Sequence, residues 1–290
     1  MKMWRLYLQL ATVGIVLQTQ SCSSCTIFGS TAVCLLKDLN SVPSLPSNTT
    51  HLFLGLNQIR EITSTSLSHL PMLQQLDLGH QHVPLVIRNN AFSKQTNMTR
   101  LDLSMNRNLQ IEPGAFAGLS KLKVLKLELC DLNEQILSSR ILEPLKSLEE
   151  LDLSANDIKR LQPAMHFVNM TDLKDLNLKL NRIGQICEAD MAGLSGKNFR
   201  FVNFASDDVF PPSLKMLNLA DNFIAEPKSE IFKYVQLLDL RMNRFHCGPG
   251  LEDFVSWIKE TNVTLKGSKD QLKCEFPSSL YGASLVDVYA

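Results

Sequence analysis

Few residues in this chain have the types and spacing that catalysis requires. Glu149 and Glu150 are adjacent carboxylates, which could supply a general acid and base, but the sequence places no partner base beside them. Cys22 and Cys25 form a C-x-x-C pair, which could bind a metal or exchange disulfides, but no second pair follows and no βαβ pattern surrounds it. The sequence also lacks G-x-S-x-G, glycine-rich phosphate-loop and H-E-x-x-H motifs. We therefore expect no enzyme, no cofactor and no metal site.

The elements that position these residues come from a repeated frame, L-x-x-L-x-L-x-x-N-x-[IL]. Its ninth-place residues recur at steps of 24, 25, 24, 26, 25, 41 and 21, at Asn57, Gln81, Asn106, Cys130, Asn156, Asn181, Asn222 and Asn243. This pattern at a step in the twenties is the leucine-rich repeat signature. Alternating leucines point inward from a short strand, and neighbouring coils bury each other's apolar faces. The frame predicts an α/β leucine-rich repeat solenoid, a curved horseshoe with a parallel β-sheet on its concave face. A βαβ enzyme is excluded because its crossovers need more residues than this step provides.

Other positions of the repeat have predictable roles. The ninth-place side chain should satisfy buried main-chain groups, with Gln81 and Cys130 as substitutes for Asn. The back of the coils carries an apolar residue at Leu67, Phe92, Phe116, Phe167 and Phe232. The step of 41 is too long for one coil, and a degenerate coil inside it (Phe199, Val202, Phe204, Asp207) would leave only 15 residues before Asn222. We expect an irregular segment at 184–212 within repeats that cover 49–243.

The first 20 residues are typical of a secretory signal. Lys2 and Arg5 precede an apolar run from Leu6 to Leu17, which is too short to span a bilayer. No later apolar stretch reaches the length of a transmembrane helix, so we expect no membrane span and release outside the cell or into the secretory or endosomal lumen. Four N-x-[ST] sequons fit an exported glycoprotein: Asn48, Asn97, Asn169 and Asn262.

Charge does not favour nucleic acid as a partner. The chain has 29 basic and 29 acidic residues, and removing the two basic residues of the signal leaves 27 against 29, a net charge of −2. Strong generic affinity for nucleic acid needs clustered Lys and Arg. A local basic patch is still compatible with this balance.

Four cysteines lie at the ends of the repeat array, where a solenoid must cover its core. Because export permits disulfides, we pair Cys25 with Cys34 in an N-terminal cap at 21–48, and Cys247 with Cys274 in a C-terminal cap at 244–290. Cys130 should be a buried thiol in the Asn row. No partner is evident for Cys22 or Cys187.

The two caps resemble those of Toll-like receptor ectodomains. The N-terminal resemblance rests on the segment from Cys25 to Cys34, followed by Val42-Pro43 and Leu45-Pro46. The C-terminal resemblance rests on Asn243-Arg-Phe245-His-Cys247 and on a helix that leads toward Cys274. The helical face is Leu251, Phe254, Val255 and Ile258, which have the i, i+3, i+4, i+7 spacing of a buried stripe.

The chain also departs from that family. Pro249 stands where the family has the second cysteine of C-x-C, so one bridge of the C-terminal cap is absent and the cap is incomplete. The family's additional coils, transmembrane helix and signalling domain are absent too. We expect either a short soluble relative or a truncated or abnormally spliced product, in which early repeats join directly to final ones.

The resemblance implies a secreted, non-catalytic pattern-recognition or decoy binding protein of innate immunity. At about 4.8 Å between strands, eight or nine coils give a face roughly 40 Å long, which suits a protein, glycan or microbial surface, or pairing with a Toll-like receptor. The alternatives are a structural or matrix-type leucine-rich repeat protein with a protein partner, and a receptor fragment with no independent function. The candidate contacts are outward strand residues of mixed charge: Gln75, Asp77, His80, Arg100, Asp102, Lys123, Lys126, Glu128, Glu149, Glu150, Asp152, Lys174, Asp175 and Lys179.

Three histidines add a hypothesis about pH. His51, His80 and His82 belong to the first two coils, and histidine gains charge at endosomal pH. They form either an acid-triggered binding site or an ordinary group of surface histidines.

Overall fold

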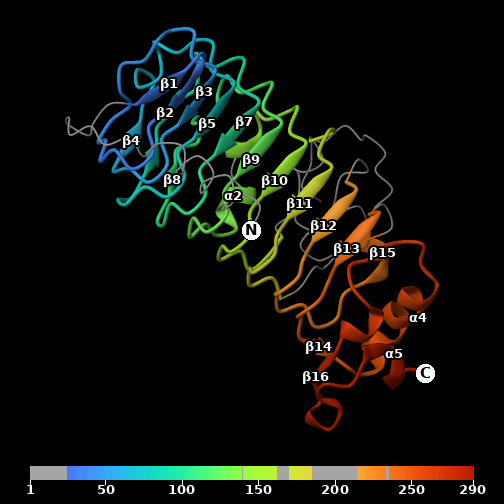
Figure 1. Ribbon diagram of the computed structural model, residues 1–290. Helices are drawn as coiled ribbons and strands as arrows, with labels where there is room; N and C mark the ends of the chain where they lie inside the picture. Colours follow the sequence, from blue (N-terminus) through green and yellow to red (C-terminus); the bar gives the residue numbers. More distant parts are fainter. Residues whose placement is uncertain (1–24, 139, 162–169, 185–213, 233–234) are drawn as a thin grey trace, which may run out of the picture.

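The structure is a solenoid whose strands stack into one long sheet (Figure 1). The computed structural model describes residues 25–138, 140–161, 170–184, 214–232 and 235–290. The predicted signal at 1–20, together with Cys22, Phe167, Asn169 and Cys187, lies outside the described residues. The order of the main sheet is β1-β2-β3-β5-β7-β9-β10-β11-β12-β13-β15, and every pair in it is parallel except β1 with β2. The leucine-rich repeat prediction is confirmed.

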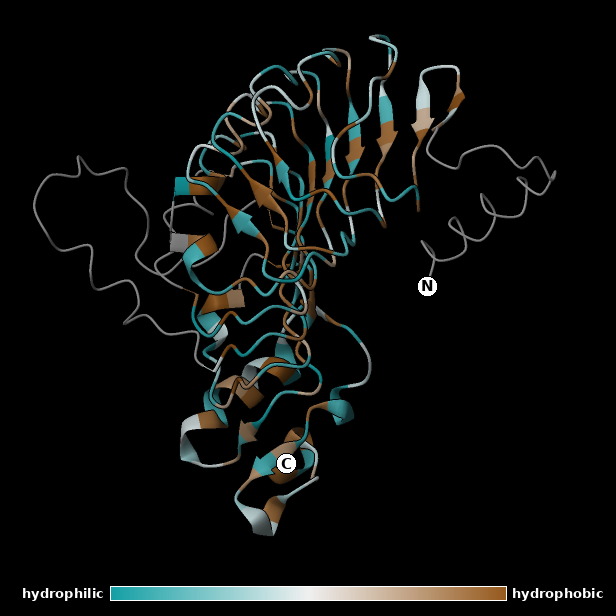
Figure 2. Cartoon of the chain, turned by 90° about the vertical axis from the view of Figure 1, so that its left-hand side faces the viewer, coloured by the Kyte–Doolittle hydropathy of each residue, from teal (hydrophilic) through white to brown (hydrophobic). Residues whose placement is uncertain are grey.

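The strands of this sheet are short. Their bounds are β1 Thr26–Phe28, β2 Thr31–Val33, β3 His51–Phe53, β5 Gln75–Asp77, β7 Arg100–Asp102, β9 Val124–Lys126, β10 Glu150–Asp152, β11 Asp175–Asn177, β12 Met216–Asn218, β13 Leu237–Asp239 and β15 Thr264–Leu265. The leucine at the centre of each repeat strand and the one two residues later face the core, and Leu151 and Leu153 are fully buried. In Figure 2 the strands of the main sheet contain both hydrophobic and hydrophilic positions.

The remaining elements cover the other side and the C-terminal end. A second sheet is formed by β4 (Glu61–Ile62), β6 (Val86–Ile87) and β8 (Gln110–Ile111), and the cap contains β14 (Phe245–His246) paired with β16 (Cys274–Phe276). The α-helices are α2 (Gln135–Ser138), α4 (Glu252–Glu260) and α5 (Leu285–Val288). The 3-10 turns are η1 Arg140–Leu142, η3 Ser229–Phe232, η4 Pro249–Leu251, η5 Lys269–Gln271 and η6 Ser278–Leu280. No helix in the described ranges is long and apolar enough to cross a membrane.

The ninth-place residues form a continuous hydrogen-bonded ladder inside the solenoid. Asn156 Nδ2 donates to the carbonyl oxygens of Leu127 and Leu153 at 2.8 and 2.9 Å. Its Oδ1 accepts from the main-chain N–H groups of Cys130 and Leu132 at 3.1 and 2.9 Å. One side chain therefore links two coils and satisfies groups that would otherwise be buried without partners.

The ladder also runs across the 41-residue step. β11 pairs directly with β12, with Asp175 opposite Met216. Asn222 Nδ2 donates to the carbonyl of Leu178 at 3.0 Å, and its Oδ1 accepts from Ile183 N–H at 3.0 Å. The segment that could hold a degenerate coil lies outside the described residues, but no strand of it separates β11 from β12. The repeat strands are thus β3, β5, β7, β9, β10, β11, β12 and β13, one for each ninth-place residue.

The back of the coils and the two ends close the core as their residue types predict. Leu67, Phe92, Phe116 and Phe232 are fully buried. At the N-terminal end Cys25 is bonded to Cys34, and at the C-terminal end Cys247 is bonded to Cys274.

Helix α4 covers the last coil. Its residues Phe254, Val255 and Ile258 are buried, as is Leu251 directly before it. The ring of Phe254 lies 6.3 Å from those of Phe232 and Phe245, centroid to centroid. The stripe expected from i, i+3, i+4, i+7 spacing is therefore the face that packs on the solenoid.

Cys130 occupies the ladder in place of Asn. Its thiol is buried and contacts the carbonyl oxygen of Leu103 at 3.1 Å, and burial raises its pKa to about 12. Because the thiolate is the reactive species, Cys130 should resist alkylation in the folded protein at pH 8 and react after denaturation. Peptide mass spectrometry after iodoacetamide treatment measures this directly. Rapid labelling of Cys130 in the native protein would contradict its burial.

Candidate ligand-binding face

The exposed side of the main sheet is the candidate binding face. The first and last residues of each strand point away from the buried leucine between them, and so does the residue two places after the strand. Of the predicted contacts, Gln75, Asp77, His80, Arg100 and Asp102 lie on coils near the N-terminal end, and Lys123, Lys126, Glu128, Glu149, Glu150, Asp152, Lys174, Asp175 and Lys179 lie on the central coils. The predicted contacts thus lie on one continuous face, but they form different kinds of interaction: turns that end strands, ion pairs, and the lining of a hollow.

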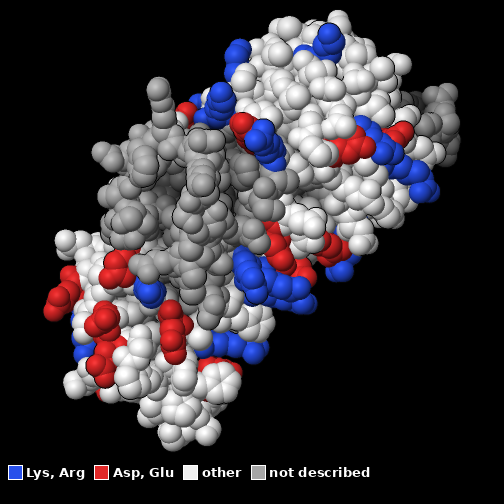
Figure 3. All heavy atoms as spheres, turned by 180° about the vertical axis from the view of Figure 1, so that it is seen from behind, with Lys and Arg blue, Asp and Glu red and all other residues white. Residues whose placement is uncertain are grey.

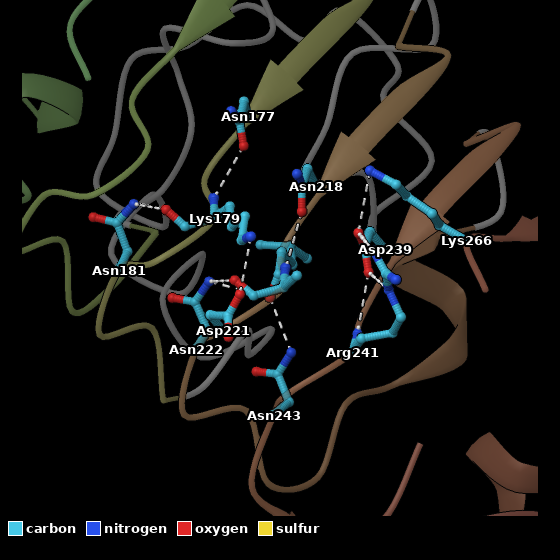
Figure 4. Close-up of polar contacts among 12 residues, drawn as sticks. Asn177, Lys179, Asn181, Asn218, Asp221, Asn222, Asp239, Arg241, Asn243 and Lys266 are labelled. Carbon is cyan, nitrogen blue, oxygen red and sulfur yellow. Dashed lines mark hydrogen bonds and ion pairs between the residues drawn. The ribbon is translucent and has the colours of Figure 1, made fainter. Parts of the chain in front are cut away.

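Acidic residues that end a strand have a structural role. The carboxylates of Asp77, Asp102 and Asp152 accept from the main-chain N–H two residues further on, at 2.8, 3.0 and 2.9 Å. Asn177 and Asn218 do the same at 3.2 and 3.1 Å (Figure 4). These are Asx turns that end the strand, so part of each side chain's bonding capacity serves the fold. In the sequence, the repeated D-L-G or D-L-S motif at the end of a strand indicates such a turn.

Three of the predicted contacts form an ion cluster at one margin of the sheet. Glu149 accepts from Lys123 at 2.8 Å and from Lys174 at 2.7 Å. These hydrogen bonds hold the pKa of Glu149 down, at about 2. All three side chains are substantially exposed, so their attraction adds little to stability.

A second cluster lies near the C-terminal end of the sheet (Figure 4). Asp239 is 3% exposed, and burial alone would raise its pKa. Arg241 outweighs that effect by donating to both carboxylate oxygens at 2.9 and 2.8 Å, while Lys266 lies 3.6 Å away, and the pKa of Asp239 is lowered. Lys179 and Asp221 form another pair at 3.3 Å.

Between these clusters the sheet contains a hollow of about 290 Å³. Its apolar surface comes from Met216 and Leu237, because the central strand leucines face the core, and its rim combines carboxylates, amides and one lysine. The lining residues are Glu150, Leu151, Asp152, Asp175, Leu176, Asn177, Met216, Leu217, Asn218, Leu237, Asp239 and Lys266. We call this the concave hollow. It brings together Glu150, Asp152 and Asp175 from the sequence-based set and adds Met216, Leu237, Asp239 and Lys266, which were not predicted although they occupy equivalent strand positions.

Asp175 is a carboxylate of the concave hollow whose nearby cations, Lys174 and Lys215, do not offset its burial. Among the described residues it forms no ion pair, whereas Glu150 lies 3.6 Å from Lys126. Burial, followed by repulsion from Glu150, raises the pKa of Asp175. On an earlier coil, burial and, as the second cause, repulsion from Asp152 raise the pKa of Glu128. The ionised carboxylates here would therefore gain from a cation supplied by a ligand.

This raised pKa makes a prediction about stability. Because the folded-state pKa of Asp175 lies above its unfolded value, its ionisation costs nothing at low pH and destabilises the fold as pH rises through the folded pKa. Asp175→Asn should therefore raise the melting temperature by about 1 °C at pH 7 and leave it unchanged near pH 3. Differential scanning calorimetry at both values measures the change. The exposed residue Asp172, changed to Asn, is the control; an equal increase from Asp175→Asn at both pH values would refute the electrostatic cause.

The histidines and sequons occupy other parts of the surface. The rings of His80 and His82 lie 5.4 Å apart, whereas His51 Nδ1 lies 2.8 Å from Thr50 Oγ1. Asn48 and Asn262 are exposed, and Asn97 is half-buried, with Oδ1 accepting from Lys121 at 3.0 Å. On the face seen from behind, acidic and basic side chains are interspersed (Figure 3). The described residues contain no cluster that could hold a metal ion.

Known proteins share the repeat. The leucine rich repeat family model matches residues 84–132. Human Toll-like receptor 5 is 34% identical over 187 residues, which cover 64% of this chain and 22% of the receptor. The chain is a leucine-rich repeat protein related to the Toll-like receptors. It spans about a fifth of the length of these relatives.

Solved leucine-rich repeat structures have the same fold. Human 5T4, or trophoblast glycoprotein, superposes with a TM-score of 0.61 at 23% identity, covering 92% of this chain and 97% of that chain. In the mouse RP105/MD-1 complex the TM-score is 0.57 at 23% identity, covering 83% of this chain and 42% of the other. The second structure is a complex of two proteins. At these identities the likeness shows the fold alone.

Proposed function

We propose that this protein is a secreted, non-catalytic binding protein of innate immunity, acting as a short receptor-like or decoy module. The concave hollow carries the proposal. It is a depression on the sheet face, with apolar side chains at Met216 and Leu237 and a rim on which carboxylates predominate. Such a surface binds a macromolecule without transforming it.

The chemistry of the concave hollow favours a protein ligand with a basic side chain. The aliphatic stem of Lys or Arg would pack on Met216, which is 39% exposed, and on Leu237. The cationic head would then approach Asp175, whose ionised form is disfavoured by burial and by repulsion from Glu150. A phosphate backbone would meet the same carboxylates and be repelled.

The immune role and the location outside the cell rest on different support. Similarity to human Toll-like receptor 5 supports the first, although the chain covers only 22% of that receptor, so its ligand and signalling do not transfer. Two disulfides and the predicted signal support the second, because disulfides persist in oxidising compartments.

An interaction screen tests the proposal. The secreted full-length chain, displayed as a multimer, would be screened against extracellular and microbial surface proteins, and each binder remeasured with Asp175→Lys. We expect at least one binder whose affinity falls about tenfold or more, because a desolvated charge pair is replaced by repulsion. Glu143→Lys, at an exposed position outside the sheet, makes the same change in net charge and should have little effect. Equal effects of both variants, or no specific binder, would refute the proposal.

A second candidate is a structural or matrix-type binding protein, a role compatible with the fold shared with 5T4 over 97% of that chain. The same screen separates the two. Selective capture of matrix or cell-adhesion proteins would replace the immune assignment, whereas selective capture of microbial or immune-receptor proteins would support it.

A further inference from the structure

A second hollow, of about 490 Å³, lies at the C-terminal end of the main sheet. It is separate from the concave hollow and lies between helix α4 and the final strand β15. Its lining is Val235, Gln236, Trp257, Thr261, Asn262, Val263 and Thr264. A volume of this size lies within the range of roughly 300–1,000 Å³ that small organic ligands occupy. We call it the terminal hollow.

One wall of the terminal hollow is a glycosylation sequon. Asn262-Val263-Thr264 connects α4 to β15, and Asn262 and Thr264 are both exposed. The main chain around Asn262 is fixed, because Val263 N–H donates to Thr261 Oγ1 at 3.1 Å and Thr264 N–H donates to the carbonyl of Gln236 at 2.8 Å. A sugar joined to Asn262 would thus begin at a defined point on the rim.

Another wall is the indole of Trp257. Its ring packs on Phe254 and Phe232, with centroids 5.7 and 5.9 Å apart, so one side is anchored in the core of the cap. The residue is only half-buried, and its remaining surface lines the terminal hollow. The C–H face of a pyranose is apolar and packs well against an aromatic ring, while its hydroxyl groups stay in water.

We propose that Asn262 carries an N-linked glycan whose first N-acetylglucosamine lies in the terminal hollow against Trp257. In the secretory pathway the Asn262 amide Nδ2 attacks C1 of a lipid-linked oligosaccharide. The C1–Nδ2 bond forms, the bond from C1 to the lipid pyrophosphate breaks, and Nδ2 releases a proton. The attached sugar then covers apolar surface beside β15, the last strand of the sheet, and blocks strand addition at that edge. The glycan acts as part of the cap.

Tryptophan fluorescence tests this arrangement. The chain has two tryptophans, and Trp4 lies in the predicted signal at 1–20, so removal of the signal on secretion leaves Trp257 as the sole indole. The full chain would be secreted from cells that make high-mannose glycans, and occupancy of Asn262 established by glycopeptide mass spectrometry. Acrylamide quenching would be measured on the intact protein, after trimming to the first sugar, and after complete enzymatic removal of the glycan.

We expect quenching of Trp257 to stay constant on trimming and to increase about twofold on complete removal, because only the first sugar covers the ring. Thr264→Ser retains the sequon and should match the parent, whereas Thr264→Val keeps the branched side chain but removes the sequon and should match the deglycosylated protein. Asn97→Gln removes a different sequon and should leave the fluorescence unchanged. An unoccupied Asn262, or quenching that complete removal does not alter, would overturn the proposal. Enzymatic removal acts on protein that has already folded, so a folding defect in Thr264→Val does not obscure the result.

Discussion

Replacing Asn156 by alanine is expected to lower the free energy of unfolding by about 3–5 kcal/mol, because three main-chain groups lose their hydrogen-bond partner at about 1–3 kcal/mol each, with partial relaxation. Those groups are the N–H of Cys130 and Leu132 and the carbonyl of Leu127, whereas the Leu153 carbonyl still accepts from Asn181 Nδ2 at 2.9 Å. They belong to the coil before that of Asn156, so the loss also uncouples neighbours in a solenoid stabilised by its interfaces. Equilibrium urea unfolding followed by circular dichroism measures the change.

Two variants make that experiment specific. Asn156→Gln should lower the free energy of unfolding much less, because Gln81 already occupies the ninth place of its own repeat. There it accepts from Ile59 N–H and donates to the carbonyl of Leu54, both at 2.9 Å. Asn133→Ala removes one exposed hydrogen bond, to Gln135 N–H at 3.0 Å, and should cost about 1 kcal/mol. If Asn156→Ala cost no more than Asn133→Ala, the ladder would not be the main link between coils.

Removal of the Cys247–Cys274 bridge is expected to have the second largest effect. The bridge closes a loop with a sequence separation of 27, for which chain entropy gives a stabilisation of about 3–4 kcal/mol. It also ties β14 to β16 at the end of the core, where both cysteines are buried. Cys247→Ser with Cys274→Ser should therefore release the cap, so that limited proteolysis cuts within 244–290 before it reaches the repeats.

The N-terminal bridge provides the comparison. Cys25 and Cys34 are separated by 9 residues, so their loss should cost less, about 2–3 kcal/mol by the same relation. Intact-mass analysis of timed digests would show which end opens first. Equal protease resistance of the parent and the Cys247/Cys274 variant would contradict a role for this bridge in closing the core.

The features that could be predicted are those in which one residue type has one physical role at a fixed spacing. Alternating leucines, the ninth-place Asn and the back-side phenylalanines each serve a coil that cannot bury itself. The stripe of α4 follows from helical periodicity for the same reason. Each of these positions has the same local environment in every coil or turn, so its spacing in the sequence is enough to identify it.

The binding face was harder to predict because its residues depend on neighbours from other coils. In the sequence Asp152 has the pattern of an exposed acidic residue. In the structure its carboxylate accepts a hydrogen bond from Ser154 N–H, which ends the strand, and another from Asn177 Nδ2 at 3.1 Å. The concave hollow includes Met216 and Lys266, which meet Glu150 only because β11 pairs directly with β12. The step of 41 residues left open whether a degenerate coil adds a strand or early repeats join directly to final ones, and β11 pairs directly with β12.

Carboxylate footprinting of the bound state tests the central proposal, that the concave hollow contacts the ligand. A binder from the interaction screen would be mixed with the secreted chain, and carbodiimide labelling of each carboxylate compared with that of the free protein. The account predicts that Asp175 and Glu150 are protected while Glu143 and Glu61, which lie outside the main sheet, keep their labelling rates. Protection of Glu143 or Glu61 with Asp175 and Glu150 unchanged would place the ligand elsewhere and contradict it.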